Sequence, residues 1–406
     1  MQSDKIVKMR SFFDYFKSLI VLVVIMQSLP FNILAQEYSD EDSLIFRNRI
    51  SENDIPDTGY SGEDSTLSEK KSSWIHGMVN AFSKACKYDP EYLSNERNQL
   101  KVRLLGTVQL PSIMIHPKSD LEKRITFSSD PLKYVGADVG WSIFTLGYSL
   151  GLDRKNDRNN GRLSFSTYTR FFAINSEVLW FNNLSISNID KFIPKEEGEH
   201  EYVIPEKIAI DGAFFRSRSL QVKFFPNGKK MAYGNTINPV FRQLRSAGTT
   251  VLSLDYTDYD FNTNLESTDL DKYEWISEVG ISNMNLYKYE IGAGYSYNFV
   301  ISRRWILFIS EVVGLSTKHY TYKMLNDDSP TSNTKIGLCN YFRTGACYYN
   351  KDYFIGTNIS YEIDALSTNQ FLFNKTNLNA VLFLGYKFKV DGFNRFVSKL
   401  LNVDIK

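Results

Sequence analysis

The chain has 406 residues, which is enough for one large domain or two ordinary ones. Aromatic residues make up 15% of it, so we expect a structured, β-rich protein rather than a disordered one. The formal net charge is only +1, which gives no support for a nucleic-acid partner.

Residues 1–35 have the pattern of a secretory signal peptide. Basic residues precede the short apolar run LIVLVVIM at 19–26, and Ile33 and Ala35 stand at the cleavage-site positions. We expect cleavage after Ala35 and export of the remaining chain. The apolar run is too short for a comfortable membrane span, and no later stretch has the roughly 18 apolar residues that a transmembrane helix needs.

Two segments precede the main domain. Residues 36–71 are polar, with ten acidic against four basic residues over 37–71, and we expect a flexible acidic leader there. Residues 72–96 are expected to form a short amphipathic helix and a connector, because Trp74, Met78, Phe82 and their apolar neighbours recur at helical spacing. Pro90 helps to end this helix.

Over residues 97–390 the pattern changes to a period of two, which is typical of half-buried β-strands. In YEIGAGYSYNF at 289–299, large residues from Tyr289 to Phe299 alternate with small or polar ones and with Glu290. The pattern predicts about twelve strands, within a range of 10–14, near 133–140, 143–152, 161–171, 174–183, 214–225, 229–237, 247–257, 288–299, 303–316, 335–348, 352–364 and 377–389. Residues 101–109 and 122–129 are further candidates.

The joints between these strands are of two kinds. Tight turns are expected at 140–143, 225–230, 301–304 and 349–353, with Asn227-Gly228 as a hairpin signal. Long loops are expected at 184–213, 258–287, 317–334 and 365–376. If every strand crosses fully, the turns at 225–230 and 301–304 fall on opposite sides, unless one strand is missed or partial. An even number of strands is therefore the safer prediction.

Two architectures fit these strands: a soluble β-domain with its apolar faces inward, and a membrane barrel with its apolar faces outward. Strands of about ten residues, short turns mixed with long loops, and aromatic residues near strand ends favour an antiparallel transmembrane β-barrel. The polar faces then line the lumen. Their charges form a candidate lumen network of Arg162, Arg170, Lys223, Glu290, Arg343 and Glu362.

This network either plugs the barrel or lines a small pore. Because a lumen of about twelve strands lies between the filled eight-strand size and the open porins, we expect substantial plugging. Glu290 needs a cationic partner, a role that Arg343 or Lys223 fits, and Gly292 and Gly294 are expected to leave room in the lumen. A soluble exported β-rich binding protein stays an alternative.

Seven stretches in a fixed order carry a resemblance to a known family: YDPEYL (88–93), LKVRLLG (100–106), YVGADVGWSIFTLGYSLGL (134–152), RSLQVKFFPNGKK (218–230), RQLRSAGTTVLSL (242–254), YEIGAGYSYNFVISRRW (289–305) and LNAVLFLGYKFKV (378–390). Together they resemble a family of Gram-negative outer-membrane proteins classed as a domain of unknown function, number 4421. The resemblance implies an outer-membrane β-barrel with no assigned activity, so it carries over no functional residue. We expect the cell outer membrane as the location and its lipid as a partner; protein partners stay unknown.

No residue is assigned a catalytic, cofactor-binding or metal-binding role. Ser316 and His319 in STKHY are a candidate pair for a lipid- or peptide-acting hydrolase, which stays a second alternative. The stretch GAGYSYN lacks the lysine and the helix of a phosphate-binding loop. Asp255, Asp258 and Asp260 lack the glycine and glutamate of a calcium loop.

Cysteines and the C-terminal tail add two smaller expectations. Cys86, Cys339 and Cys347 have neither a disulfide framework nor metal-ligand spacing, and we expect half-buried fillers. The tail, 391–406, has apolar residues at helical spacing, so we expect either a short amphipathic helix at the periplasmic surface or a frayed end.

Overall fold

The structure is a computed structural model, and it describes residues 88–94, 99–118, 125–152, 160–182, 184–187, 207–210, 212–236, 241–263, 281–325, 329–368 and 371–392. The expected signal peptide, acidic leader, most of the segment 72–96 and most of the tail 391–406 lie outside these residues. Among the described residues, no helix is long and apolar enough to cross a membrane.

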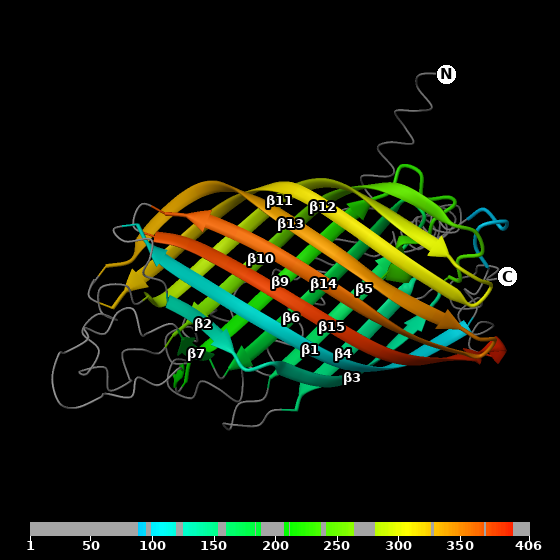
Figure 1. The fold of residues 1–406 in the computed structure, drawn as a ribbon, viewed down its shortest axis with the longest axis horizontal. Helices are drawn as coiled ribbons and strands as arrows, with labels where there is room; N and C mark the ends of the chain where they lie inside the picture. Colours follow the sequence, from blue (N-terminus) through cyan, green and yellow to red (C-terminus); the bar gives the residue numbers. More distant parts are fainter. Residues whose placement is uncertain are drawn as a thin grey trace, which may run out of the picture. The chain divides into compact units, whose positions relative to one another are not determined.

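Twelve antiparallel strands form a closed ring (Figure 1). In chain order they are β1 (Gln99–Pro117), β3 (Leu132–Trp141), β4 (Phe144–Gly151), β5 (Gly161–Tyr168), β6 (Phe172–Asn182), β9 (Phe214–Phe224), β10 (Ala247–Asn262), β11 (Ile281–Val300), β12 (Trp305–Met324), β13 (Thr331–Tyr349), β14 (Tyr353–Ser367) and β15 (Phe371–Lys389). The ring closes where β1 pairs with β15, from Gln99 opposite Lys389 to Pro117 opposite Phe371. This confirms the predicted all-β antiparallel barrel of about twelve strands.

Three short strands extend the sheet from one end of the ring. The first, β2 (Ile125–Ser129), pairs with the far part of β1. It continues through β7 (Leu184–Ser187) to β8 (Lys207–Ala209). The predicted strand at 122–129 therefore exists, but it stands outside the ring. Consequently β1 has β3 as its neighbour near its start and β2 near its end.

One predicted strand is wrong, and its correction settles which turns share an end. Residues 229–236, the described part of this segment, form no strand; the chain turns after β9 and then forms a short 3-10 helix, η1 (Tyr233–Thr236). Asn227-Gly228 therefore lies in a turn but starts no hairpin. The candidate strand at 101–109 is instead a full member of the ring, as β1. The turns at 225–230 and 301–304 then fall at the same end, which we call the short-turn end; the opposite end is the loop end.

The ring has a low side and a tall side. Strands β3 to β6 and β9 are 8–11 residues long, whereas β1 and β10 to β15 are 15–20 residues long. The tall strands run past their predicted ends into segments that were expected to be loops, at 258–287, 317–334 and 365–376. With 15–20 residues each, the tall strands are longer than the roughly ten tilted residues that cross a hydrocarbon layer.

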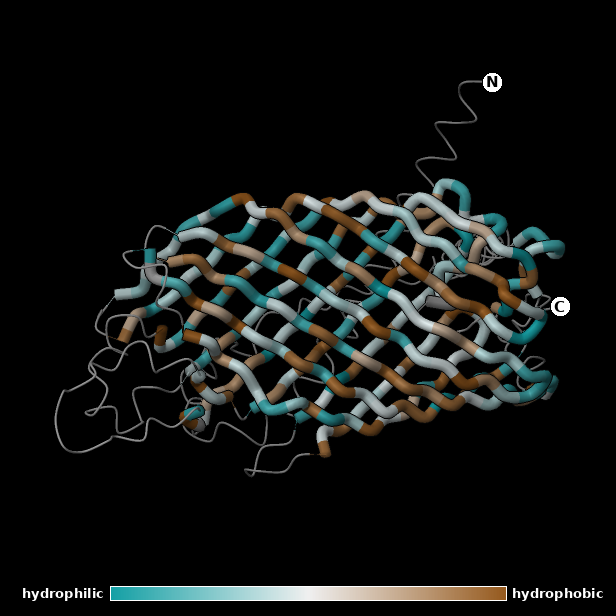
Figure 2. The backbone as a smooth tube through the Cα atoms, viewed as in Figure 1, coloured by the Kyte–Doolittle hydropathy of each residue, from teal (hydrophilic) through white to brown (hydrophobic). Residues whose placement is uncertain are grey.

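The outer face of the ring is apolar over a limited height. Hydrophobic and hydrophilic residues alternate along the strands (Figure 2). On β12 the exposed residues are apolar from Trp305 to Leu315, except for Glu311, and then turn polar at Thr317. Asn340 on β13 donates a hydrogen bond of 3.0 Å to the Glu311 carboxylate. Eleven residues from 305 to 315 match the roughly 9–11 residues of a membrane-spanning β-strand.

The stretch at 289–299 forms the second half of β11, with its large residues outward. Tyr289 is 59% exposed, Ile291 62% and Tyr295 55%. The two glycines face inward, but they leave no open space. A Cβ atom built on Gly292 would lie 2.6 Å from a serine hydroxyl, and one on Gly294 would lie 1.9 Å from a backbone oxygen of β12. Glycine therefore lets β12 pack closely against β11.

Candidate functional site

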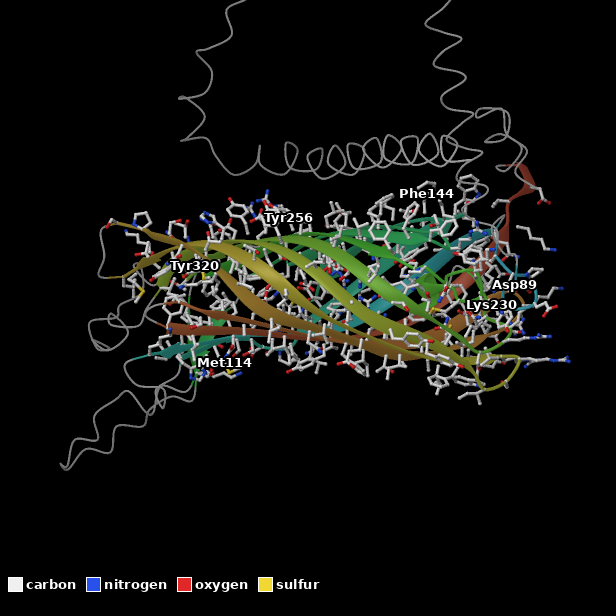
Figure 3. The ribbon with its side chains drawn as sticks, turned by 90° about the horizontal axis from the view of Figure 1, so that it is seen from above. Asp89, Met114, Phe144, Lys230, Tyr256 and Tyr320 are labelled. Atoms are coloured by element: carbon white, nitrogen blue, oxygen red, sulfur yellow. The ribbon has the colours of Figure 1, made fainter. Side chains whose placement is uncertain are left out.

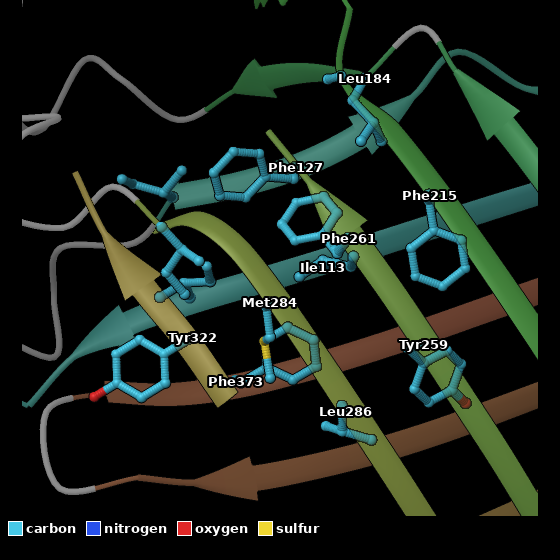
Figure 4. Close-up of a cluster of buried hydrophobic side chains, with 14 of the residues drawn as sticks. Ile113, Phe127, Leu184, Phe215, Tyr259, Phe261, Met284, Leu286, Tyr322 and Phe373 are labelled. Atoms are coloured by element: carbon cyan, nitrogen blue, oxygen red, sulfur yellow. The ribbon is translucent and has the colours of Figure 1, made fainter. Parts of the chain in front are cut away.

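The candidate site is the interior of the barrel, which holds three layers of different chemistry. At the loop end lies an apolar layer to which β2, β7 and most ring strands contribute (Figure 4). Its buried residues include Ile113, Phe127, Leu184, Phe261, Met284 and Phe373. The Phe127 and Phe261 rings meet edge to face, with centroids 5.5 Å apart. We call this group the loop-end layer.

The middle of the interior holds a compact ionic group centred on Lys288 of β11. The Lys288 ammonium lies 3.3 Å from a Glu290 oxygen, 3.4 Å from Glu362 and 3.2 Å from Asp364. Lys318 also pairs with Asp364. Lys375 lies 3.7 Å from a Glu362 oxygen. We call these six residues the Lys288 cluster; its three positive and three negative charges balance.

Elsewhere on the inner wall, two further ion pairs link neighbouring strands. The Arg103 Nε of β1 donates a hydrogen bond of 2.8 Å to Asp138 of β3, its register partner. The Arg162 Nε of β5 donates one of 2.8 Å to Glu177 of β6. Both arginines also donate from Nη2, which gives the strong, charge-assisted form of such contacts.

The short-turn end is filled by residues 88–94, 225–236 and 241–246, together called the inner plug. A bridge joins Leu93 to Gln243, and the two segments exchange backbone hydrogen bonds. Asp89 and Lys230 accordingly lie at the same end of the barrel (Figure 3). Asn298 of β11 donates hydrogen bonds of 3.3 Å to the Ala232 carbonyl and 3.2 Å to Gln243, which anchors the plug to the wall.

Charged groups of the wall also hold the inner plug. Lys223 is only 1% exposed, and its ammonium donates a hydrogen bond of 3.1 Å to the Tyr233 hydroxyl of η1. Burial would raise the pKa of this hydroxyl, but the positive charges of Lys223 and Arg343 outweigh burial and hold the pKa below its ordinary value. Tyr233 therefore couples the plug electrostatically to the wall.

Between the loop-end layer and the inner plug lies a cavity of about 200 Å³. Serine, threonine and asparagine side chains make up much of its lining, together with the ion pairs and part of the Lys288 cluster. The cavity is thus polar and hydrogen-bonding in character.

The structure separates the six predicted network residues into three places. Arg162, Glu290, Arg343 and Glu362 line the cavity. Lys223 lies beneath the inner plug, and Arg170 lies in the turn between β5 and β6, against the Phe171 ring.

The predicted partner of Glu290 was wrong. Neither Arg343 nor Lys223 pairs with it; its partner is Lys288, two positions away on the same strand. Strand parity alone, which places residues 288 and 290 on one face, would have found this contact. The same parity places Asp364 beside Glu362, whereas Lys318 and Lys375 fell in segments that were predicted to be loops.

The geometry overturns the candidate hydrolase pair. Ser316 is buried inside the barrel, while His319 lies on the outer face, where its ring contacts the Thr334 hydroxyl at 3.0 Å. A strand places residues of opposite parity on opposite faces, so the two side chains cannot meet across β12. Cys339 and Cys347 are both buried rather than half-buried, and no disulfide joins them. Within the described ranges, no group of three or more His, Cys, Asp or Glu side chains is placed to hold a metal ion.

The family described as a domain of unknown function (DUF4421) matches residues 87–388, which is most of the chain. The chain belongs to the DUF4421 family. No curated protein matches this DUF4421 sequence.

Solved structures similar to the DUF4421 barrel include several outer-membrane proteins, all at low identity. The transport unit of the autotransporter AIDA-I from Escherichia coli is 13% identical, with 78% of this chain and 98% of that chain covered and a TM-score of 0.33. The toluene transporter TodX of P. putida is 10% identical, with 71% of this chain and 90% of that chain covered and a TM-score of 0.26. The attachment invasion locus protein Ail of Yersinia pestis is 9% identical, with 70% of this chain and 98% of that chain covered and a TM-score of 0.22.

Proposed function

We propose that this protein is exported through a signal peptide cleaved after Ala35 and acts as a closed outer-membrane barrel, with a structural or surface-interaction role. The observation that carries the closed state is the filling of the interior at three levels. The loop-end layer, the Lys288 cluster and the inner plug follow one another along the lumen. An open pore needs a continuous polar passage, and the apolar loop-end layer interrupts it.

The outer face supports insertion into lipid. A soluble protein rarely exposes an apolar area larger than a few hundred Å², yet exposed Leu, Ile, Val, Phe and Tyr residues recur on every neighbouring strand from β10 to β15. Trp305 and Tyr353 lie at the short-turn edge of this apolar belt, and Tyr289 and Tyr361 at its other edge, as amphipathic rings do at membrane interfaces. In the proposed orientation the short-turn end faces the periplasm and the long loops face the exterior.

Planar-bilayer recording of the folded protein tests the closed state. We expect no steady large conductance from the parent protein. A variant whose residues 228–243 are replaced by a short Gly-Ser linker removes much of the inner plug, and a second variant adds Phe127→Ala and Phe261→Ala in the loop-end layer. We expect steady current only in the second variant, because each seal closes the lumen by itself. Large steady current through the parent would reject the closed state.

Two cheaper experiments test the location and the barrel itself. Fractionation should leave the protein in the membrane until detergent is added, whereas a soluble binding protein would be released without it. Heat-modifiable migration in gels should be present, since a closed barrel resists unfolding by detergent at room temperature. Release in the soluble fraction would reject membrane insertion.

A further inference from the structure

Arg343 on β13 is a buried cation without a carboxylate. It faces the cavity and is 8% exposed. Its Nη2 donates a hydrogen bond to the Tyr341 hydroxyl, while its Nε and Nη1 atoms are buried without a hydrogen-bond partner. Throughout the part of the chain that the structure describes, no carboxylate pairs with it.

The other cations that line the same cavity do have carboxylate partners. Arg103 pairs with Asp138, Arg162 with Glu177, and Lys288 and Lys375 pair within the Lys288 cluster. Among the described cations that line the cavity, Arg343 is therefore the one without a carboxylate partner.

Lys223, a buried cation of β9, is held differently. Its ammonium donates to the Tyr233 hydroxyl, and Asp255 is its diagonal neighbour in the β9–β10 ladder. Asp255 itself lines the cavity, and one of its carboxylate oxygens is buried without a hydrogen-bond partner. Once the charge of Asp255 is set against that of Lys223, the surplus at the cavity wall is the single charge of Arg343. A buried ion costs several kcal/mol unless it is paired and hydrogen-bonded, so this arrangement calls for an anion.

We propose that the cavity beside Arg343 binds a small organic anion with a single carboxylate group. One uncompensated positive charge matches one carboxylate, whereas a phosphate dianion would leave the buried site negative. Guanidinium N–H groups pair with carboxylate oxygens in the strong, charge-assisted form of hydrogen bond. Ser360, the register partner of Arg343 on β14, also lines the cavity and supplies a hydroxyl donor.

The size of the cavity restricts the ligand further. Its volume of about 200 Å³ lies below the roughly 300–1,000 Å³ of pockets that take drug-sized molecules. A molecule of a few carbon atoms fits, whereas a lipid acyl chain or an oligosaccharide does not. The amide and hydroxyl groups of the lining favour a polar body over an aliphatic one. A closed barrel needs no such ligand, so the inference goes beyond the proposed function.

Acetate is the probe for the first experiment. The protein is folded from urea into detergent micelles with sodium acetate or sodium chloride at equal ionic strength, so that acetate need not pass the closed ends. We expect the thermal unfolding midpoint to rise with acetate concentration, because a ligand bound to the folded state stabilises it. When radiolabelled acetate is present from the start of folding, equilibrium dialysis at the same acetate concentration should show saturation at one acetate per chain.

Variants decide whether Arg343 is the site. We expect Arg343→Gln to weaken acetate binding by about tenfold or more, and Arg343→Lys to weaken it less. Arg304→Gln, which changes an exposed arginine of the β11–β12 turn, is the matched control and should bind as the parent does. In chloride alone, Arg343→Gln should be at least as stable as the parent, because it removes an uncompensated buried charge.

Several outcomes would overturn the proposal. They are no acetate binding by the parent, binding of inorganic phosphate in place of acetate, equal binding by Arg343→Gln, or a loss of stability by that variant in chloride. The last result would show that the protein's own groups satisfy Arg343. If Arg343→Gln fails to fold, the parent dialysis and Arg343→Lys still decide. Conductance in bilayers bears on the closed state alone, so the two proposals fail separately.

Discussion

Lys288→Met tests how much the ionic cluster inside the barrel contributes to stability. The Lys288 side chain is 4% exposed, and its ammonium contacts three carboxylates at 3.2–3.4 Å. Methionine has nearly the same length and no charge. The substitution therefore leaves the packing almost unchanged and gives the remaining cluster a net charge of about −1.

The expected loss follows from the distances. At 3.3 Å, each attraction amounts to about 5 kcal/mol at an effective dielectric constant of about 20. The cost of desolvating buried ions offsets much of this attraction, and removing one partner of a buried pair typically costs about 3–5 kcal/mol. We expect Lys288→Met to lower the free energy of unfolding by that amount. Urea unfolding in micelles, followed by tryptophan fluorescence, measures it.

A second substitution separates charge from packing. Glu290 has Lys288 as its ion-pair partner, so Lys288→Met combined with Glu290→Gln restores the balance of the cluster. Glu362 then keeps Lys375, and Asp364 keeps Lys318. We expect the double variant to recover most of the lost stability, as a double-mutant cycle would show. Parent-like stability in Lys288→Met, or a double variant no more stable than Lys288→Met, would refute the reasoning.

Three further predictions concern packing and the outer face. Gly294→Val should lower the free energy of unfolding, measured by urea titration, by about 2 kcal/mol or more, because its Cβ would lie 1.9 Å from a backbone oxygen. Gly106→Val is the control and should be nearly neutral in the same titration, because the Cβ would have no neighbour nearer than 4.0 Å. Leu382→Arg, at an outward position that is 62% exposed, should lower the free energy of unfolding in lipid vesicles by about 2–4 kcal/mol. Thr317→Arg, above the belt, should lower it by only about 0–1 kcal/mol. Equal losses in the two variants would contradict the proposed membrane position. Phe127→Ala should lower the urea unfolding free energy by about 3–5 kcal/mol, since the side chain is 1% exposed, and a loss below about 1 kcal/mol would show that the loop-end layer is loosely packed.

Alternation along the apolar belt of the outer face was enough to predict the barrel. Ile291 and Leu384 face outward there, and their neighbours in sequence face inward, so the period of two is visible locally. The segment 229–237 misled because its large residues are buried for another reason. Met231 and Tyr233 pack inside the barrel as parts of the inner plug. Burial in the lumen and exposure to lipid require the same residue types, and the sequence does not distinguish them.

The tall parts of the strands were missed because the pattern inverts above the belt. On β12 beyond Leu315, the outward residues are polar, such as Thr317 and Thr321, and the inward ones include Tyr320 and Tyr322. This is the alternation of a soluble sheet, and it reads as a loop when a lipid-facing pattern is sought. Lys318 lies in this part of β12, so a central member of the ionic cluster could not be predicted.

Pairing across the β1–β15 seam has a consequence for how the protein is made. Gln99 at the start of β1 lies opposite Lys389 at the end of β15, and the ladder continues without interruption to Pro117. The contacts that close the ring therefore join the first and last parts of the barrel sequence, and such non-local contacts form slowly. A nascent chain carries its lipid-facing residues unprotected until the last strand has been synthesised. If the barrel lies in the outer membrane, as proposed, its insertion must therefore follow the synthesis of β15.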